Sequence, residues 1–456
     1  MCFIILFQEE VLMKKTNIMF FFDTEDFTSE TCADATLHLA NLLTEEGVKG
    51  HFAVVALFAE QLTNWGRTDV VEALKKHIIG THTYGHSLHP TIAEDSEGED
   101  YNAAYRRVCE KESTALNMLK QHLGTDEILF AVPPGNCITY VGLYVYRDLG
   151  IPFFCGSNVY DDRNTLIDYS GMTHIEYVDS LENMFFYNDR PTEEILDSIR
   201  DFDRVIFYTH PNITVKKEFW DALNYAHGNL REYGNWIEAE DRTPDEIQYL
   251  RDRFRELIRA LKEDEHFRIT DIHELNKQKN SLPVRTICPS DLMGIRNALN
   301  AHFYPPRNGA YSIAEVFHAC VNFLNGENIF CPDDHKLYGF LDVPKGITET
   351  VTLSRQNIIE TARNTDWSGF LPAEIDVGGS MIGPADYLFA MLEILTTDSA
   401  EITLIPREQN VMYPELEELC WAHMDSSNWM HVHDFHDEYV SHRLRLQSWT
   451  LRYCGI

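Results

Sequence analysis

Two histidines placed four residues apart, His82 and His86, lie in the glycine-flanked segment Gly80–Ser87, directly after an apolar run. An acidic group, Asp23–Asp26, likewise follows the apolar run Ile18–Phe22. If both runs are neighbouring strands of a parallel sheet, their ends bring carboxylates and imidazoles to the same edge. Such groups can converge on one divalent cation, so the sequence predicts a metal site suited to hydrolysis.

The elements that must position these groups are expected between residue 16 and about residue 275. Short apolar runs alternate there with amphipathic segments, many of which end at a glycine. This alternation predicts an α/β fold, a parallel sheet or barrel with its functional groups at the carboxyl ends of the strands. The strands are expected at Ile18–Phe22, His51–Val55, Ile128–Val132, Ile151–Cys155, Arg204–Tyr208 and Phe267–Thr270, and the helices at Thr31–Glu46, Val70–Lys76, Tyr101–Leu123, Tyr140–Leu149, Thr192–Ile199 and Pro244–Lys262.

The remainder of the chain lacks this rhythm. Residues 281–456 are expected to form a smaller, mainly helical accessory domain, after a barrel domain at 16–280 and an N-terminal extension at 1–15. Two helix-like pieces, Tyr311–Phe317 and Ile382–Phe389, each carry an acid followed by aromatics. They indicate either an imperfect duplication or two unrelated amphipathic helices.

The composition narrows the class of protein. The 456 residues include 38 basic and 72 acidic ones, a formal charge of −34, which repels nucleic acid and anionic membranes. No apolar run reaches the ~20 residues that a membrane-spanning helix needs. The ten cysteines show no CxxC pair, and the apolar N-terminus lacks a basic region and a cleavage site. We therefore expect a cytoplasmic protein with reduced cysteines; an oligomer is left open.

The order of the motifs resembles one family, the metal-dependent polysaccharide deacetylases of carbohydrate esterase family four, over residues 16–275. Its second motif is matched by Ile79–His86, and its opening strand with an Asp-x-acid ending by Phe22–Glu25. Its later strand ending in histidine is similar to Ile206–His210, and its proline motif is partly matched by Ala131–Gly135. The resemblance implies a distorted (β/α) barrel.

The same resemblance implies a divalent metal held by Glu25, His82 and His86, with Asp26 as the rival of Glu25. Zn²⁺ is the expected ion, ahead of Co²⁺, Ni²⁺ or Mn²⁺. Two neutral imidazoles and one carboxylate would leave coordination positions open for water and substrate.

Three further residues receive catalytic roles from the resemblance. Asp23 is expected to be the base, His210 the acid, and Asp162 the carboxylate that holds the charged form of His210. These roles suit amide hydrolysis near neutral pH, because that reaction needs an activated water and an acid for the leaving amine.

Substrate contacts are expected from Tyr84, inside the histidine motif, and from Pro133, Pro134 and Gly135. The proline motif departs from the family at Ala131, where an arginine that orients the base is common. This departure bears on how Asp23 is positioned and on which substrate is bound.

Each motif also has a purely structural interpretation. A His-x-x-x-His pair can be two solvated imidazoles on a surface helix, and Asp23–Asp26 can cap a helix. Pro133–Gly135 can be a simple turn. A third histidine group, at residues 431, 433 and 436, has the alternating spacing of a solvated loop.

The function expected is that of a hydrolase acting on carbon–nitrogen bonds other than peptide bonds. It would remove an N-acetyl or similar amide-linked acyl group from an amino sugar or oligosaccharide. One alternative is a hydrolase of a small C–N substrate, such as a ureide or a formamido sugar. The other is a non-catalytic carbohydrate-binding relative. The expected partner is a carbohydrate or small amide.

Overall fold

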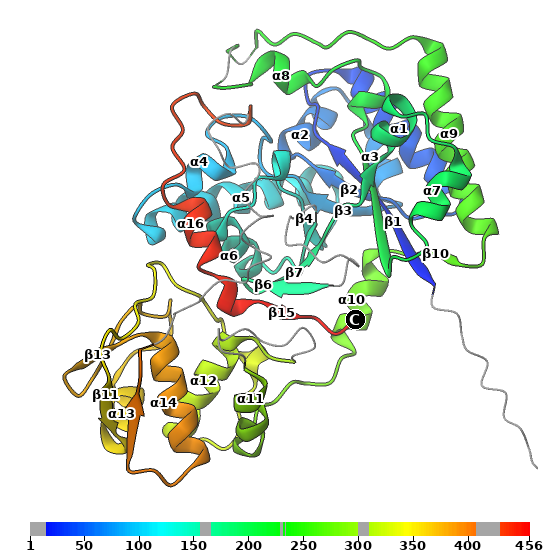
Figure 1. The fold of residues 1–456 in the computed structure, drawn as a ribbon. Coiled ribbons are helices and arrows are strands. Elements are labelled where there is room, and N and C mark those ends of the chain that lie inside the picture. Colours follow the sequence, from blue (N-terminus) through cyan, green and yellow to red (C-terminus); the bar gives the residue numbers. More distant parts are fainter. Residues whose placement is uncertain (1–14, 156–165, 229–230, 233, 300–309, 407–428) are drawn as a thin grey trace, which may run out of the picture.

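The computed structural model describes residues 15–155, 166–228, 231–232, 234–299, 310–406 and 429–456. Figure 1 shows a larger body, in which helices surround a curved sheet, and a smaller body below it. The predicted extension at residues 1–15 lies outside the described residues, except for its last residue.

The sheet of the larger body has eleven strands in the order β15-β6-β7-β5-β4-β3-β2-β1-β9-β8, with β10 paired to the start of β1. Eight pairings are parallel, and only the edge that holds β6, β7 and β15 is antiparallel. Within the residues that the structure describes, the two outermost strands, β8 and β15, do not pair with each other. An open, distorted α/β barrel results, which confirms the predicted fold class. The strands are β1 (Thr16–Thr24), β2 (His51–Val54), β3 (Ile78–Thr81), β4 (Phe130–Ala131), β5 (Phe153–Cys155), β6 (Ile167–Tyr169), β7 (Met172–Ile175), β8 (Asp179–Ser180), β9 (Arg204–Thr209), β10 (Phe267–Ile269) and β15 (Arg452–Tyr453).

Strand β1 is central because both of its faces are covered. Every side chain of Ile18–Phe22 is fully buried, as expected for a continuous apolar run in a parallel sheet. Phe20 and Phe22 pack into the core shared with the outer helices, whereas Met19 and Phe21 pack into the barrel interior. The buried strand therefore fixes the position of the acidic residues that follow it, at the carboxyl end of the sheet.

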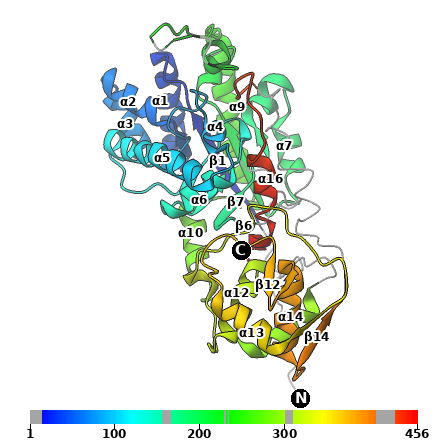
Figure 2. The same ribbon diagram turned by 90° about the vertical axis from the view of Figure 1, so that its left-hand side faces the viewer.

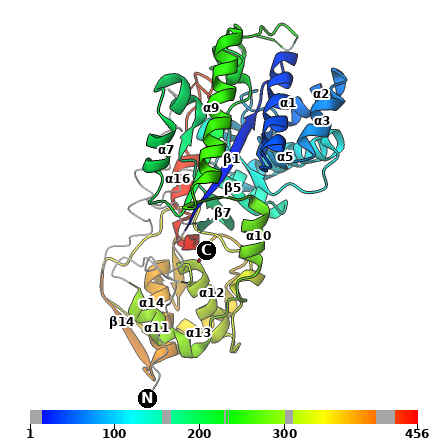
Figure 3. The same ribbon diagram turned by 90° about the vertical axis from the view of Figure 1, so that its right-hand side faces the viewer.

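The outer helices carry the start and stop signals that their sequences contain. The longest, α5 (Tyr101–Leu123), ends at Gly124, whose φ of 64° is the left-handed conformation that glycine favours. Helix α9 (Pro244–Glu263) begins with a capping box between Thr243 and Glu246. Figure 3 shows α9 beside β1, between α7 and α1. The other helices are α1 (Glu30–Glu45), α2 (Ala56–Asn64), α3 (Thr68–Leu74), α4 (Ile92–Ser96), α6 (Tyr140–Asp148), α7 (Thr192–Ser198), α8 (Trp220–Asn224) and α10 (Ile272–Asn280), with the short turns η1 (Pro134–Asn136), η2 (Asn183–Tyr187) and η3 (Asn212–Thr214).

The smaller body has its own hydrophobic core, built around two helices that pack against each other, α12 and α14. These helices contain most of the two pieces whose similarity suggested a duplication. The duplication and the division at residue 280 both stay predictions. The elements are η4 (Pro289–Asp291), α11 (Leu292–Ala298), α12 (Ile313–Leu324), η5 (Pro332–Asp334), β11 (Val351–Ser354), α13 (Arg355–Asn364), β12 (Ile375–Val377), β13 (Ser380–Ile382), α14 (Pro384–Thr396) and β14 (Glu401–Leu404), with β11 paired to β14 and β12 to β13.

The chain then returns to the barrel. Helix α16 (Val440–Arg445) packs against α6, the turn η6 (Ser448–Thr450) follows, and β15 pairs antiparallel with β6. Figures 1 and 2 show this segment, in red, running along the larger body above the smaller one. Residues 429–456 therefore contact both bodies.

The buried side-chain amide of Gln447 hydrogen-bonds to the barrel, to the smaller body and to the C-terminal segment that returns to the barrel. Gln447 Oε1 accepts hydrogen bonds from the Tyr144 hydroxyl of the barrel, at 2.6 Å, and from the Gly339 amide of the smaller body, at 2.9 Å. Its Nε2 donates to the carbonyls of Phe340 and Arg443, at 2.7 and 2.8 Å. The side chain is fully buried, so none of these groups has water as a substitute.

Replacing Gln447 with alanine is expected to lower the free energy of unfolding by about 2–5 kcal/mol, because several buried polar groups lose their partner at once. Urea unfolding followed by circular dichroism measures this change. The matched control is Gln356→Ala, since that exposed amide donates a hydrogen bond to Glu360 on its own helix. A loss no larger than that of the control would show that the junction does not depend on Gln447.

Among the described residues, no helix combines the length and the apolar character that crossing a membrane requires.

Candidate metal and catalytic site

Three buried side chains meet at the carboxyl ends of β1 and β3. The ligand atoms of Glu25, His82 and His86 all lie within 4.8 Å of one another. The Nε2 atoms of His86 and His82 lie 3.0 and 3.6 Å from Glu25 Oε2. The strand register explains the meeting, because Thr24 pairs with Val54 of β2, which pairs with Thr81 of β3, so β1 and β3 end at the same level.

The loop after β3 folds back tightly to bring the second imidazole to the first. Thr83 and His86 both have positive φ values, 67° and 53°, which side chains other than glycine rarely adopt. The Thr83 hydroxyl accepts a hydrogen bond from the His86 amide at 3.1 Å and so holds the turn. Gly80 precedes the loop, and a Cβ there would clash with the Phe130 ring. Backbone strain of this kind is typical of functional sites.

A second layer of contacts orients both imidazoles. Nδ1 of His82 lies 3.0 Å from the Val132 carbonyl, and Nδ1 of His86 lies 3.2 Å from Asp221 Oδ2. Asp221 is itself held by the Ser87 hydroxyl at 3.2 Å. Each histidine therefore presents Nε2 to the centre, the arrangement found around metal-ligating histidines.

The contacts of Glu25 and Asp26 distinguish between these two candidate metal ligands of the first motif. Glu25 faces the imidazoles and accepts from the Asn212 amide at 3.2 Å. Asp26 instead faces its own loop, where Oδ1 accepts from the Thr28 amide at 2.9 Å and Oδ2 lies 2.9 Å from the Cys32 sulfur. The geometry thus favours Glu25 as the ligand, and Asp26 caps the turn before α1.

The charges of the centre suit a cation. Burial alone would raise the pKa of Glu25, but the positive charge of His86 and hydrogen bonds from both histidines hold it well below its usual range. Burial would lower the pKa of His86, but Glu25 and Asp221 raise it to about 10. A bound divalent cation would take the place of that imidazolium proton. Two imidazoles and a carboxylate also form a donor set of the catalytic zinc type, so these residues fit a metal.

Asp23 lies beside this centre at the end of β1 and is almost fully buried. Its Oδ1 accepts a hydrogen bond from the Tyr177 hydroxyl at 3.0 Å, and its Oδ2 lies 3.8 Å from His210 Nε2. Tyr177 stacks on Tyr208 of β9, with ring centroids 4.5 Å apart. Tyr177 therefore positions Asp23, whereas Ala131, where the family commonly has arginine, is buried in β4.

His210, after β9, is held by a carboxylate that the sequence did not indicate. Glu182 Oε1 accepts from the His210 amide at 2.6 Å and lies 3.5 Å from its Nδ1. Burial would lower the pKa of His210, but the hydrogen bond and charge of Glu182 and the charges of Glu25 and Asp23 raise it to about 9. Asp162, predicted for this role, lies outside the described residues. The sequence signal that could have indicated Glu182 is its position just after the short strand β8, because β8 pairs with β9, the strand that leads to His210.

Replacing Glu182 with glutamine removes this negative charge, so the pKa of His210 is expected to fall from about 9 toward about 6.5. His210 must carry its proton to act as an acid, so activity would be lost at lower pH than in the wild type. A rate profile between pH 6 and 9 tests this, with the larger loss expected at pH 8. An alkaline limb that stays in place would remove Glu182 from this role.

The proline motif forms a buried turn next to the returning chain. Pro133 and Pro134 are buried, and Gly135 has a φ of 54°. A Cβ on Gly135 would lie 2.6 Å from Met430 Cγ, so this close approach requires glycine. The carbonyl of Val132, just before the turn, is the group that orients His82. Substrate binding by these residues stays a prediction.

Tyr84 is half-buried, and its side chain packs against the main core of the barrel. Its amide donates to Glu112 Oε1 at 3.4 Å. These contacts give Tyr84 a structural role, and substrate binding by Tyr84 also stays a prediction.

The third histidine group shows no convergence on one point. His431 is buried and stacks on Phe435, whereas His433 stacks on His227 and His436 is exposed. In the part of the chain that the structure describes, Glu25, His82 and His86 form the only group of three residues positioned to hold a metal ion.

No family model matches the sequence, and no curated protein matches it. Carbohydrate esterases of family 4 are among the solved structures similar to this chain. One, from Bacillus anthracis, is 13% identical, with a TM-score of 0.31, covering 58% of this chain and 84% of that one.

Two other similar structures differ from it in activity. A family 4 pseudoenzyme from Bacillus anthracis is 11% identical, with a TM-score of 0.29, covering 44% of this chain and 56% of that one. A 4-α-glucanotransferase from Thermococcus litoralis is 11% identical, with a TM-score of 0.41; the match covers 58% of this chain but only 41% of the transferase. The family that the motifs resemble is thus found among structures similar to the chain. Likenesses this distant carry no argument about activity or substrate.

Proposed function

We propose that this protein is a metal-dependent hydrolase that removes an N-acetyl or similar amide-linked acyl group from an amino sugar or oligosaccharide. The observation that carries the proposal is the grouping of a buried two-histidine, one-carboxylate centre with Asp23 and His210 beside it. Amide hydrolysis needs one group that accepts a proton and one that donates it. Asp23 and His210 lie 3.8 Å apart and supply such a pair.

The chain's own residues divide the proton transfers. Asp23 accepts the proton of the attacking water at Oδ2, the oxygen that Tyr177 leaves free. His210, which Glu182 keeps charged, donates its Nε2 proton to the nitrogen of the leaving amine. A divalent cation held by Glu25, His82 and His86 would polarise the acyl oxygen and lower the pKa of water.

We propose Zn²⁺ as the resident ion, because a two-imidazole, one-carboxylate donor set with open positions is typical of catalytic zinc. Co²⁺, Ni²⁺ and Mn²⁺ are the alternatives. Metal analysis of the purified protein identifies the ion, and reconstitution of chelated protein with each ion compares their activities. We also propose a reducing compartment, the cytoplasm, from the spacing of the cysteines.

The experiment that tests the function measures acetate released from N-acetylglucosamine oligomers by the metal-loaded protein. Release that stops after chelation and returns with the metal supports the proposal. A protein that holds stoichiometric metal but hydrolyses no acetylated or formylated amine would be a non-catalytic binder.

One observation favours a different substrate of the same reaction class. Tyr177, not an arginine, holds Asp23, and Ala131 stands at the position where arginine is common in the family. A neutral hydroxyl leaves Asp23 without the positive charge that the family has there. A small C–N substrate, a ureide or a formamido sugar, is therefore the second candidate, and hydrolysis restricted to such compounds would select it.

A further inference from the structure

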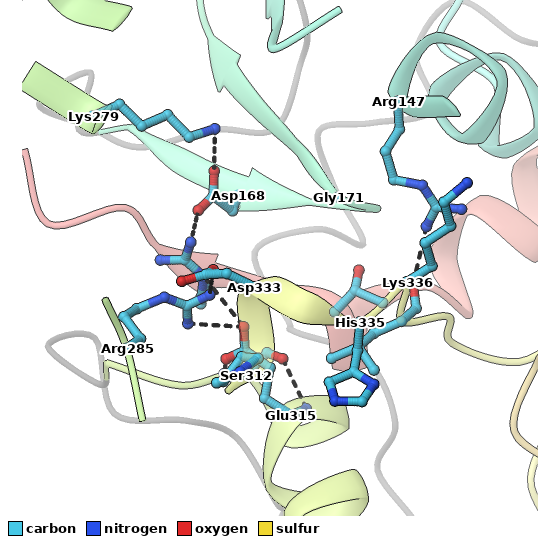
Figure 4. Close-up of a pocket in the computed structure, with 14 residues that line it drawn as sticks. Arg147, Asp168, Gly171, Lys279, Arg285, Ser312, Glu315, Asp333, His335 and Lys336 are labelled. Atoms are coloured by element: carbon cyan, nitrogen blue, oxygen red, sulfur yellow. Dashed lines mark hydrogen bonds and ion pairs between the residues drawn. The ribbon is translucent and has the colours of Figure 1, made fainter. Parts of the chain in front are cut away.

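A cavity of about 300 Å³ lies between the two bodies of the molecule, away from the metal centre. Its walls come from α6, α10 and the β6–β7 hairpin of the barrel, from α12 and the segment after η5 in the smaller body, and from β15 (Figure 4). Five lysine or arginine side chains line it against three carboxylates. This excess of positive charge is found in a chain whose formal charge is −34.

One wall of the cavity is electrically balanced. Three cations and three carboxylates alternate along it in a connected network. Figure 4 shows Lys279, Asp168 and Arg285 of this network on the left. Arg452 contacts two buried acids, Asp168 and Glu315, and Arg285 contacts Glu315 at 2.8 Å and also Asp333. Lys279 completes the series, 3.8 Å from Asp168. This network holds the bodies together and leaves little charge for a ligand.

The opposite wall of the cavity carries the excess positive charge. Arg147 of α6 and Lys336 of the smaller body share a single carboxylate, Asp148, at 2.9 Å each. Even with Asp148 counted, the cations outnumber the carboxylates around the cavity by five to four. Figure 4 shows Arg147 and Lys336 approaching each other across the boundary between the bodies, next to His335.

Both of these cations have hydrogen-bonding capacity left. The Lys336 ammonium has three N–H groups, and within the described residues it contacts Asp148 alone. Arg147 has five N–H groups, of which three donate to Asp148, the Leu337 carbonyl and the Tyr338 hydroxyl. The guanidinium is also fixed between the rings of Tyr144 and Tyr338. It is therefore pre-oriented, which lowers the entropy lost on binding.

We propose that this cavity binds a small anion that carries a phosphate or carboxylate group, with Arg147 and Lys336 as its main contacts. A cation would be repelled by the surplus charge, and an apolar ligand would leave the charged walls without solvent. The volume is at the lower end of the ~300–1,000 Å³ of small-molecule sites, so the ligand is small. Because the two contacts belong to different bodies, the bound anion would stabilise their docking.

The test is isothermal titration of the full-length protein with sodium phosphate and, separately, with sodium gluconate, at an ionic strength held constant with sodium chloride. Saturable binding of at least one probe is expected, together with a rise in the melting temperature. Tighter binding of phosphate would indicate a phosphorylated ligand, and tighter binding of gluconate a carboxylated one.

The variant pair Lys336→Glu and Lys345→Glu locates the site. Both lysines are exposed side chains of the smaller body, 62% and 67% accessible, and each is paired with one carboxylate, so the changes in charge and context match. The Lys336 variant is expected to bind the probe at least tenfold more weakly, and the Lys345 variant within twofold of the wild type. Lys336→Gln, which only removes the charge, should give an intermediate loss.

Two results would overturn the proposal: no saturable binding of either probe, or equal weakening in both charge-reversal variants. Far-UV circular dichroism and the melting temperature without anion establish that the variants are folded. Binding that persists in His82→Ala would separate this cavity from the metal centre, since phosphate also binds metal ions. The cavity is thus tested independently of the proposed hydrolysis.

Discussion

Turnover by the Asp23→Asn variant is expected to be lower than that of the wild type by about 10²–10⁴-fold, the usual cost of losing a general base. An asparagine oxygen can still accept the hydrogen bond from Tyr177. The amide cannot take up a proton from the attacking water, however. The expected result is therefore a folded protein with its metal in place and a turnover rate reduced by orders of magnitude.

The measurement is turnover at saturating substrate, with metal content determined on the same preparation. Asp201→Asn, at an exposed position outside the site, is the control for the change in charge and should keep wild-type turnover. If Asp23→Asn turns over as fast as that control, Asp23 does not act as the base.

The second large effect is expected for His82→Ala, which removes one of the three ligand atoms. Metal content should fall from about one ion per chain to almost none, and acetate release should fall with it. The fold should survive, because His82 lies at the rim of the barrel, after the end of β3. Outside the metal centre, its Nδ1 contact with the Val132 carbonyl is the main contact that the variant loses.

His273→Ala is the matched control, since that imidazole is half-exposed on α10 and pairs with the exposed Glu127. Elemental analysis after extensive dialysis compares the two variants with the wild type. A His82→Ala protein that retains stoichiometric metal would exclude the assignment of the centre.

The barrel could be predicted because its elements carry local signals. The five apolar residues of β1 predict a buried strand, and the capping and terminating residues of α5 and α9 predict where those helices begin and end. Each signal lies within a short stretch of sequence. Helix α2 was not predicted, since its N-cap, Val55, makes no side-chain capping bond. The hairpin of β6 and β7 was missed as well, because each strand has only three or four residues.

The three metal-ligand residues could be predicted because their positions along the chain identify them. Glu25, His82 and His86 follow strand ends, and the register of a parallel sheet brings such positions together. Tyr177, Glu182 and Asp221 could not be found in this way, because each reaches the site from a segment without a motif. Their contacts cross 28 to 154 residues of sequence and exist only after folding.

Asp26 illustrates the limit of a motif. The sequence offered it as the rival of Glu25, one residue away. Only the path of the chain after β1 decides between them, because it turns Asp26 toward Thr28 and Cys32. Asp26 thus holds the turn before α1, whereas the helix itself is capped by Ser29, whose hydroxyl accepts a hydrogen bond from the Thr31 amide.

The pairing of β15 with β6 has a consequence for biosynthesis. The hydrogen bond from the Ser170 amide to the Thr450 hydroxyl spans 280 residues. The free edge of β6 therefore stays unpaired until the ribosome has translated this length of chain and β15 is available. At about 5–20 residues per second, this takes roughly 15–60 s. During that time the nascent barrel presents unpaired backbone groups, which are a template for misassembly. We expect chaperones to engage the ribosome-bound chain at this edge, and release to follow once β15 has emerged.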